Sequence, residues 1–298
     1  MKETKVFEQG KSKWYQIRKN DLPTIASLRA DGLDPEILAY AIDEDENAHV
    51  EYDAESGTLL LVFNVPKKDD TLYEASPIAF IVTKDAVYSF TTDYTDYIND
   101  FISGLLSNEP ELSKLSLVFK TLYLCVHAYF PIIKDVNKKR AYLTTKLKSK
   151  ATKHNLLELS DLGIGLVYIV TAIDQNDLLL NQLSKLGFYK DLTESEKERL
   201  EDAQIEADQV VAMARVADQI LDEVAATYNN LLNNNLNETM RLLTIWSLLL
   251  TVPTIVTGFF GMNVLLPFKD SPFGWIFILL ISLILSLGLL FTILRRIK

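Results

Sequence analysis

Apolar residues fill two long stretches near the C-terminal end of the chain. Residues 242–260 carry no charged side chain. At about 1.5 Å of rise per helical residue, this stretch nearly covers the roughly 30 Å hydrocarbon core of a bilayer. Residues 272–294 form a second uncharged stretch. Both are predicted to be transmembrane helices, joined by a short loop over residues 261–271.

The first of these stretches is not evenly apolar. Polar or small residues recur on one face at steps of three and four, and this polar stripe begins before the span: Asn230, Asn233, Asn237, Met240, Thr244, Ser247, Thr251, Thr254 and Gly258. At any single position, such residues usually serve tight helix packing, with hydroxyls bonded to carbonyls one turn back. A stripe over the whole span instead favours a helix that lines water. Two spans cannot enclose a polar path alone, so the stripe predicts a symmetric oligomer.

The residues before this span predict one very long helix. Thr193 and Glu196 have the spacing of a capping box, and no Pro or Gly follows until Pro253. Small and apolar residues recur in heptads, at Ala203, Ala207, Val210, Ala214, Ala217, Leu221, Val224, Tyr228 and Leu231. The other faces are acidic. We therefore expect a stalk bundle, formed with helices of several subunits, that continues into the membrane.

The N-terminal third alternates short strands and helices. A strand is predicted at residues 14–18, and Asp21 and Asp34 stand where helix N-caps are expected. Two hairpins follow, pairing residues 49–53 with 58–65 and residues 78–83 with 86–91. The pattern predicts a mixed α/β domain.

Helical periodicity extends from about residue 97 to residue 186. Pro131 is expected to bend or break the first of these helices, and a second is predicted over residues 155–186. The Gly163 and Gly165 pair lacks the strand and third glycine of a nucleotide-binding fingerprint, so we interpret it as a packing point. Residues 134–153 are rich in Lys and Arg, which favours a solvated helix face over a lipid-headgroup site.

Composition narrows the functional classes. The 298 residues are 48% hydrophobic and 23% charged, with a formal net charge of −10. The negative charge argues against nucleic-acid binding and favours a chain that tolerates or attracts cations. The single cysteine, Cys125, lies in an apolar run, and the histidines are scattered, so neither a disulfide framework nor a zinc or catalytic cluster is expected. We predict no enzyme activity.

Charge also predicts the orientation in the membrane. No apolar signal sequence follows the N-terminal charges, Arg241 precedes the first span, and Arg295, Arg296 and Lys298 follow the second. The positive-inside rule places both termini in the cytosol and the protein in the cell membrane. The expected segments are a cytosolic α/β domain (1–98), cytosolic helices (99–192), a stalk helix (193–241) continuous with the first span (242–260), an extracellular loop (261–271), the second span (272–294) and a basic cytosolic tail (295–298).

Several motifs resemble the CorA family of divalent-cation transporters. They are Asn-Glu-Thr-Met at residues 237–240, Leu-Thr-Ile at 243–245, Pro253, Gly-Phe-Phe-Gly-Met-Asn at 258–263 and the basic tail. Gly-Met-Asn at the end of the first of two C-terminal spans is highly specific. The resemblance is strong over residues 191–298 and weaker over the N-terminal domain, where residues 32–38 match in kind.

The resemblance implies a funnel-shaped homopentamer in the bilayer, with Mg²⁺ as substrate and the first span lining the pore. Mg²⁺ dehydrates reluctantly, so a ring of neutral amide oxygens suits its hydrated form. The expected selectivity motif is therefore Gly261, Met262 and Asn263. The family often continues with an acidic residue after this motif, whereas this chain has Lys269 nearby. Other pore-lining residues, with Met240 and Leu243 as candidate apolar gates, are expected at Asn237, Met240, Leu243, Thr244, Ser247, Thr251, Thr254 and Gly258.

A regulatory role for cytosolic Mg²⁺ is also expected. Ten acids against three cations in residues 194–223 would repel each other in a ring of stalks, and divalent ions between subunits would relieve that repulsion. The resemblance places a sensor near Asp202, flanked by Glu201 and Glu206, while Asp53 and Glu55 are candidates for the partner acid. The simpler alternative is that these acids only solvate the helix.

The favoured interpretation is a channel-like transporter of hydrated Mg²⁺ that is gated by cytosolic Mg²⁺. Transport of another divalent metal, such as Co²⁺, Ni²⁺ or Zn²⁺, stays open. A membrane-anchored scaffold is the third alternative, although a scaffold would not need a polar stripe along a whole span.

Overall fold

The structure is a computed structural model that describes residues 2–68, 73–149, 152–262 and 273–297. The chain forms two compact units, Met1–Ala225 and Ala226–Lys298, and the boundary falls inside helix α7.

A six-stranded sheet forms the centre of the first unit. Its strand order is β1-β2-β6-β5-β4-β3, with β2 and β6 parallel and the other neighbours antiparallel. The strands are β1 (Lys2–Phe7), β2 (Ser12–Arg18), β3 (His49–Asp53), β4 (Thr58–Pro66), β5 (Ala75–Val82) and β6 (Ala86–Thr91). The predicted strand and both predicted hairpins are confirmed. The charged edge strand β1 was not predicted, because Lys and Glu interrupt its apolar alternation.

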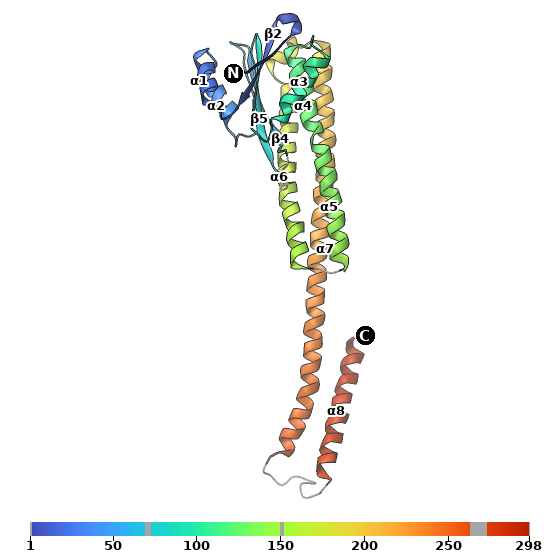
Figure 1. Ribbon diagram of the computed structural model, residues 1–298. Helices are drawn as coiled ribbons and strands as arrows, with labels where there is room; N and C mark the ends of the chain where they lie inside the picture. Colours follow the sequence, from blue (N-terminus) through green and yellow to red (C-terminus); the bar gives the residue numbers. More distant parts are fainter. Residues whose placement is uncertain (1, 69–72, 150–151, 263–272, 298) are drawn as a thin grey trace. The chain divides into compact units, whose positions relative to one another are not determined.

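Helices cover both faces of this sheet (Figure 1). On one face, α1 (Leu22–Ala30) and α2 (Pro35–Ile42) contribute Leu28 and Ile37 to a core that includes Leu60 and Ile81 of the sheet. Both helices begin as predicted, because the Asp21 and Asp34 side chains accept hydrogen bonds from backbone N–H groups in the first turns. Burial on both faces explains why β4 and β5 are almost continuously apolar.

A layer of helices covers the other face. It contains α3 (Tyr97–Asn108), α4 (Lys114–His127), α5 (Tyr129–Ser149), α6 (Lys153–Leu183) and the first part of α7 (Glu194–Phe260), with short 3₁₀ turns η1 (Glu8–Gly10) and η2 (Gly187–Asp191). The predicted break near Pro131 is confirmed, because α4 ends at His127 and Pro131 lies in the first turn of α5, where a proline needs no N–H donor.

A buried polar network holds this layer against the sheet. The Asn64 backbone N–H donates to Asn176 Oδ1 at 2.8 Å, and the Asn64 carbonyl accepts from Asn176 Nδ2 at 2.7 Å and from the Tyr129 hydroxyl at 2.9 Å. Burial raises the pKa of the Tyr129 hydroxyl, so the group stays a neutral donor. The strand end of β4 is thereby fixed to α5 and α6.

The heptad seam of α7 is buried by the chain itself. Ala203, Ala207, Val210, Ala214, Ala217 and Leu221 are each at most 3% exposed. A Cβ atom added at Gly163 of α6 would lie 3.3 Å from Leu221 Cδ2, which confirms the predicted packing point. Over these six positions the partners of the seam come from the same chain rather than from other subunits, whereas Leu231, the last predicted position, is 46% exposed. Periodicity shows that a face is buried, but it does not show which chain supplies the partner.

The capping box at the start of α7 is also confirmed. Glu196, 8% exposed, accepts bonds from the Thr193 backbone N–H and hydroxyl at 2.9 Å each, and from the Ser113 hydroxyl at 2.6 Å. The Thr193 hydroxyl oxygen also accepts from the Glu196 N–H at 3.3 Å. The carboxylate therefore links the helix start to the N-cap of α4.

Glu196→Ala is expected to lower the free energy of unfolding by about 2 kcal/mol, because three partly buried donors lose their acceptor. Thermal unfolding of the full chain in detergent would measure this. Glu194→Ala is the matched control: it removes an acid that is 92% exposed and should change stability by less than about 0.5 kcal/mol. Equal effects of the two changes would contradict the role of Glu196.

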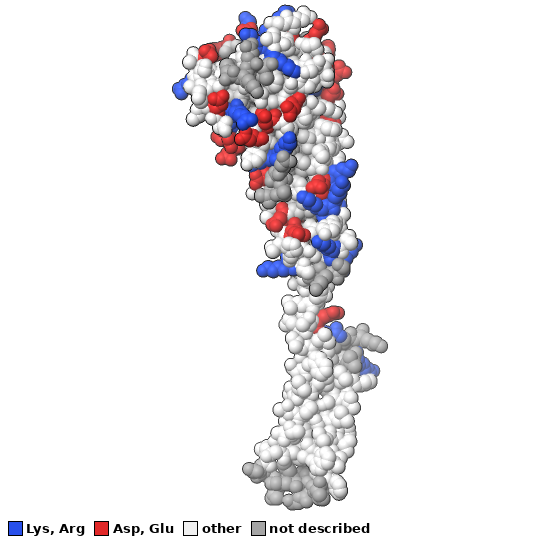
Figure 2. Space-filling view, viewed as in Figure 1, with Lys and Arg blue, Asp and Glu red and all other residues white. Residues whose placement is uncertain are grey.

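The second unit contains the rest of α7 and helix α8 (Gly274–Ile297). By length and composition, four helical stretches of the described residues could cross a membrane. Their apolar windows are 56% buried in α4 to α5 and 39% in α6, but only 6% in α7 and in α8. The first two stretches therefore serve the core of the first unit. In the face shown in Figure 2, charged side chains cover the first unit and are sparse on the second.

Candidate functional site

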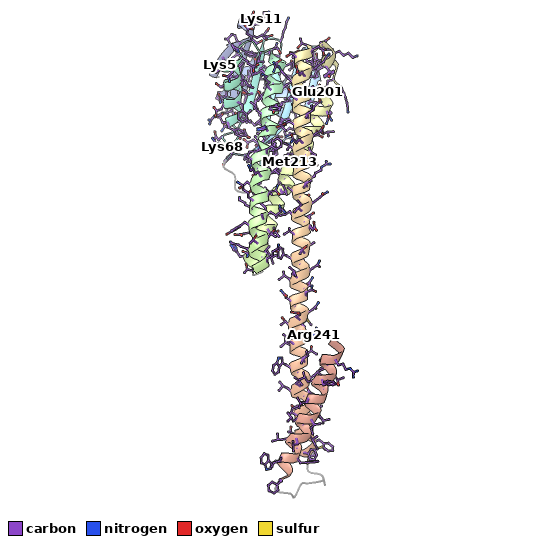
Figure 3. All side chains as sticks on the ribbon, turned by 90° about the vertical axis from the view of Figure 1, so that its right-hand side faces the viewer. Lys5, Lys11, Lys68, Glu201, Met213 and Arg241 are labelled. Carbon is purple, nitrogen blue, oxygen red and sulfur yellow. The ribbon has the colours of Figure 1, made fainter. Side chains whose placement is uncertain are left out.

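The polar stripe of α7 lies open on the second unit. Every predicted member from Asn230 to Gly258 is exposed in the single chain. Helix α8 lies beside the C-terminal part of α7 (Figures 1 and 3), and the least exposed positions there are Ile245, Leu249, Val252, Pro253, Val256 and Phe260. At about 100° per residue, the least exposed positions and the stripe fall on opposite faces of α7. The polar stripe is therefore the face that α8 leaves uncovered.

Hydroxyl groups of the stripe bond to the helix backbone. Thr244, Thr251 and Thr254 each donate to the carbonyl four residues earlier, at 2.9, 2.7 and 2.9 Å. Each hydroxyl hydrogen is thus used within the helix, as in ordinary membrane helix packing. The oxygen keeps lone pairs that can accept hydrogen bonds from water. A water-facing stripe of this kind presents acceptors, which suits a hydrated cation.

Two glycines shape the C-terminal end of α7. A Cβ atom added at Gly258 would meet nothing within 4 Å. At Gly261 it would lie 3.1 Å from the Thr257 carbonyl oxygen, while the Gly261 N–H still donates to that oxygen at 2.9 Å. Gly261 therefore permits a tight last turn, followed by Met262, which is 52% exposed. Asn263, the predicted selectivity residue, lies outside the described residues.

The N-terminal part of the stripe carries Asn237 and Met240, and Leu243 follows them one turn later. Met240 is 58% and Leu243 62% exposed, although both are large and apolar. Figure 3 shows the side chain of Arg241, the cation that precedes the first span, beside this end. In a ring of copies, these exposed apolar side chains would meet the same residues of other copies, as the gate prediction requires.

The predicted sensor acids on α7 have different surroundings. Glu201 and Asp202 are exposed, and Figure 3 shows Glu201 on the outside of the helix. Asp202 lines a hollow of about 270 Å³ together with Lys120 and Arg199. Glu206 Oε1 lies 2.8 Å from His127 Nδ1 of α4, an intrachain pair that the sequence did not reveal.

The acids proposed as partners lie at the β3–β4 turn. Asp53 accepts from the backbone N–H groups of Glu55 at 2.9 Å and Ser56 at 3.2 Å, and from the Ser56 hydroxyl at 2.5 Å. These bonds, with that of the Ser56 hydroxyl first, lower the pKa of the Asp53 carboxyl. Asp53 thus stabilises the turn, whereas Glu55 is exposed. Within the described ranges, no three His, Cys, Asp or Glu side chains form a group that could hold a metal ion.

Negative charge is crowded farther along α6 and α7. Burial, followed by Asp208 and Asp174, raises the pKa of Asp177, and burial followed by Asp222 raises that of Asp218. Asp174 also pairs with Arg215 at 3.0 Å. Burial is the larger cause of both raised pKa values, and repulsion between neighbouring acids adds to it.

Comparison with known proteins gives consistent matches. The family model described as CorA-like Mg²⁺ transporter protein matches residues 9–296. The curated cobalt/magnesium transport protein CorA of Methanocaldococcus jannaschii is 22% identical over 263 residues, 86% of this chain and 81% of that protein.

Two solved structures show the same fold. The complete CorA magnesium transporter from Methanocaldococcus jannaschii matches with a TM-score of 0.82 at 20% identity, covering 99% of this chain and 93% of that one. The full-length CmaX protein matches with a TM-score of 0.73 at 16% identity, covering 96% and 88%.

Proposed function

The chain belongs to the CorA family of divalent-cation transporters, a family of membrane transporters rather than enzymes, and from this premise we propose that it conducts hydrated Mg²⁺ through a pore lined by α7. The observation that carries the proposal is the stripe from Asn237 to Gly258, which apart from Met240 is polar or small, is exposed in one chain and lies opposite the face nearest α8. A polar face in a membrane requires partners or water. Copies of α7 around an axis supply both.

The assembly we propose is a ring of identical subunits, specifically a homopentamer. A head-to-tail interface repeated around an axis closes into a ring. The number five comes from the family resemblance. The M. jannaschii relative is named a cobalt/magnesium transport protein, and this name makes Co²⁺ the first alternative cargo.

Selection at the outer mouth is assigned to Gly261, Met262 and Asn263. Mg²⁺ holds its waters tightly, so a ring that hydrogen-bonds the hydration shell costs less free energy than one that strips it. Threonine and serine oxygens of α7 continue this lining inward. Asn237 would form a second amide ring, with Met240 and Leu243 as an apolar constriction that closes by dewetting.

Orientation follows from charge. Arg241 before the first span and the basic residues after the second favour a cytosolic location for both ends, with the loop at residues 261–271 outside. We place the protein in the cell membrane, with the first unit and its acidic α7 surface in the cytosol.

Flux into liposomes tests the proposal. Purified protein is reconstituted into vesicles that contain a Mg²⁺-sensitive dye, and Mg²⁺, Co²⁺, Ni²⁺ or Zn²⁺ is added outside. A dye response to Mg²⁺ that protein-free vesicles lack supports the assignment. A response only to Co²⁺, Ni²⁺ or Zn²⁺, measured with dyes for those ions, would make that ion the transported substrate in place of Mg²⁺. Absence of flux for all four ions would contradict the proposal that the protein is a transporter.

Regulation by cytosolic Mg²⁺ gives a further prediction. We propose that Mg²⁺ between the acidic α7 surfaces of neighbouring subunits favours a closed state, because it binds that state more tightly. Glu201→Gln combined with Asp202→Asn should then raise flux at millimolar internal Mg²⁺ and reduce the protection that Mg²⁺ gives α7 against protease. Glu206 is left unchanged because it pairs with His127.

The matched control for this variant replaces two exposed acids on the sheet face opposite α7, Asp31→Asn after α1 and Glu36→Gln in α2. It removes the same charge and should leave inhibition and protection as in the original protein. If the α7 variant also keeps both, Glu201 and Asp202 do not sense Mg²⁺.

A further inference from the structure

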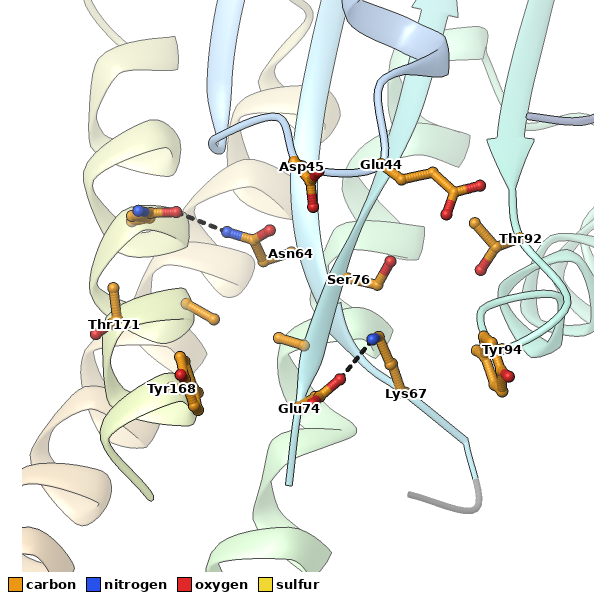
Figure 4. A pocket seen from close by; sticks show the side chains of 13 residues that line it. Glu44, Asp45, Asn64, Lys67, Glu74, Ser76, Thr92, Tyr94, Tyr168 and Thr171 are labelled. Atoms are coloured by element: carbon orange, nitrogen blue, oxygen red, sulfur yellow. Dashed lines mark hydrogen bonds and ion pairs between the residues drawn. The ribbon is translucent and has the colours of Figure 1, made fainter. Parts of the chain in front are cut away.

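A polar hollow of about 450 Å³ opens on the first unit (Figure 4). Its lining comes from the segment after α2, the end of β4, the start of β5, the segment after β6, and α6. Pockets that hold small organic ligands have volumes of about 300–1,000 Å³. The hollow is therefore large enough for such a ligand.

Two hydrogen-bond acceptors in this hollow receive no hydrogen bond from the described residues. Ser76 is 5% exposed, and its hydroxyl makes no hydrogen bond with any residue that the structure describes. Asn64 is 7% exposed and its Nδ2 donates to Gln175 Oε1 at 2.8 Å. Its Oδ1, which Figure 4 shows turned away from that hydrogen bond, has no donor in the same part of the chain. Neither oxygen is fully enclosed, so both can accept hydrogen bonds from water or from the N–H groups of a ligand in the hollow.

Two carboxylates at the same hollow lack a described ion-pair partner. Glu44 and Asp45 are exposed, and neither makes an ion pair with a described residue. Lys67 and Glu74 pair with each other at 2.6 Å, so they contribute no net charge. Lys19 donates to the Asp43 carbonyl at 2.5 Å, and burial lowers its pKa to about 8. Glu44 is the first of the acids whose charge raises that pKa, so Lys19 compensates Glu44 in part, whereas Asp45 is not among these acids. The hollow therefore favours a cation.

Aromatic rings stand at two sides of the opening. Tyr94 is 61% and Tyr168 58% exposed, and Figure 4 shows them across the hollow from each other. The Lys67 ammonium already lies 5.9 Å from the centre of the Tyr94 ring. Ring faces attract organic ammonium and guanidinium groups, whereas Mg²⁺ keeps its waters and gains less from such a surface.

We propose that this hollow binds a small organic cation with two nitrogen groups, such as a diamine or a guanidino-amine. One nitrogen group donates to Ser76 Oγ and Asn64 Oδ1, and the other lies against the Glu44 and Asp45 carboxylates. The binding is a property of the first unit and does not depend on the transported ion.

Calorimetric titration of the full chain in detergent, without divalent ions, tests the proposal. Agmatine and putrescine are expected to bind, and 1,4-butanediol, which has the length of putrescine without its charges, is not. Glu44→Gln with Asp45→Asn should weaken binding by about 10- to 100-fold, as expected for lost charge-assisted bonds. Ser76→Ala should weaken it by about tenfold or less. Glu51→Gln, at an exposed acid on β3, is the control and should bind as the original does.

Three results would each overturn the proposal. The first is no heat from either amine, and the second is equal binding by the original chain and both pocket variants. The third is that MgCl₂ gives the same heat of binding as the amines and displaces them from the protein. The unfolding temperature of each variant shows whether it is folded. If Ser76→Ala is unfolded, the test rests on the variant with Glu44→Gln and Asp45→Asn, whose two positions are exposed. The titration measures amine binding and not ion flux. Its result would therefore stand even if the protein transported no ion.

Discussion

Gly258→Leu is expected to stop Mg²⁺ flux. Position 258 lies on the polar stripe, so in the proposed ring every copy would place an isobutyl group in the path. A hydrated ion would then have to lose water to pass, and an added barrier of about 3 kcal/mol already slows passage about 100-fold. Within one chain a Cβ atom at this position meets nothing within 4 Å, so the subunit fold should tolerate the change.

Gly288→Leu is the matched control for this prediction. Gly288 lies in α8 and is exposed, and a Cβ atom added there would also meet nothing within 4 Å. The two variants therefore add the same side chain to an open position in a membrane helix. Normal flux through the Gly258 variant, or equal loss in both, would contradict the assignment of this face of α7 to the pore.

Asn263→Ala is expected to remove selective uptake while the oligomer stays intact. The side chain would supply the amide oxygens that bond the hydration shell of Mg²⁺, and alanine has no polar atom to replace them. Losing one such bond per subunit, at about 1 kcal/mol each, corresponds to at least a tenfold loss of preference for Mg²⁺ over other cations. Competition between Mg²⁺ and Ca²⁺ in the liposome assay would measure this preference.

The control for Asn263→Ala is Asn235→Ala. Asn235 is an exposed asparagine of α7 that is not on the stripe, so its loss should change neither flux nor selectivity. Size-exclusion chromatography with light scattering would establish that both variants keep the oligomeric state of the original chain. An Asn263 variant with unchanged selectivity would remove this residue from the selective site.

Local signals in the sequence were sufficient for most secondary structure. The hairpins, the aspartate caps at positions 21 and 34, the break near Pro131 and the Thr193 capping box all depend on residues within a few positions of one another. Such signals act through backbone geometry and short-range hydrogen bonds. Strand β1 was missed because pairing with β2, rather than its own apolar alternation, makes it a strand.

Contacts between distant residues could not be predicted in the same way. The pairs Glu206–His127 and Glu196–Ser113 join positions 79 and 83 residues apart, and the hollow at Ser76 takes its lining from five separate segments. Sequence spacing carries no signal for such neighbours. The heptad seam likewise revealed a buried face, but only the structure showed that helices of the same chain cover it.

The sequence by itself determined that the end of α7, from residue 242, and α8 are apolar and helical and that one face of α7 is polar, because helix period and side-chain polarity are properties of consecutive residues. The Gly-Met-Asn motif likewise identified the family from sequence. Only the tertiary structure decided that the stripe lies opposite the face nearest α8, that α4 to α6 serve a core despite their apolar character, and that Asp53 caps a turn. Each of these depends on which surface another segment covers, and that is fixed by packing across the whole chain rather than by local sequence.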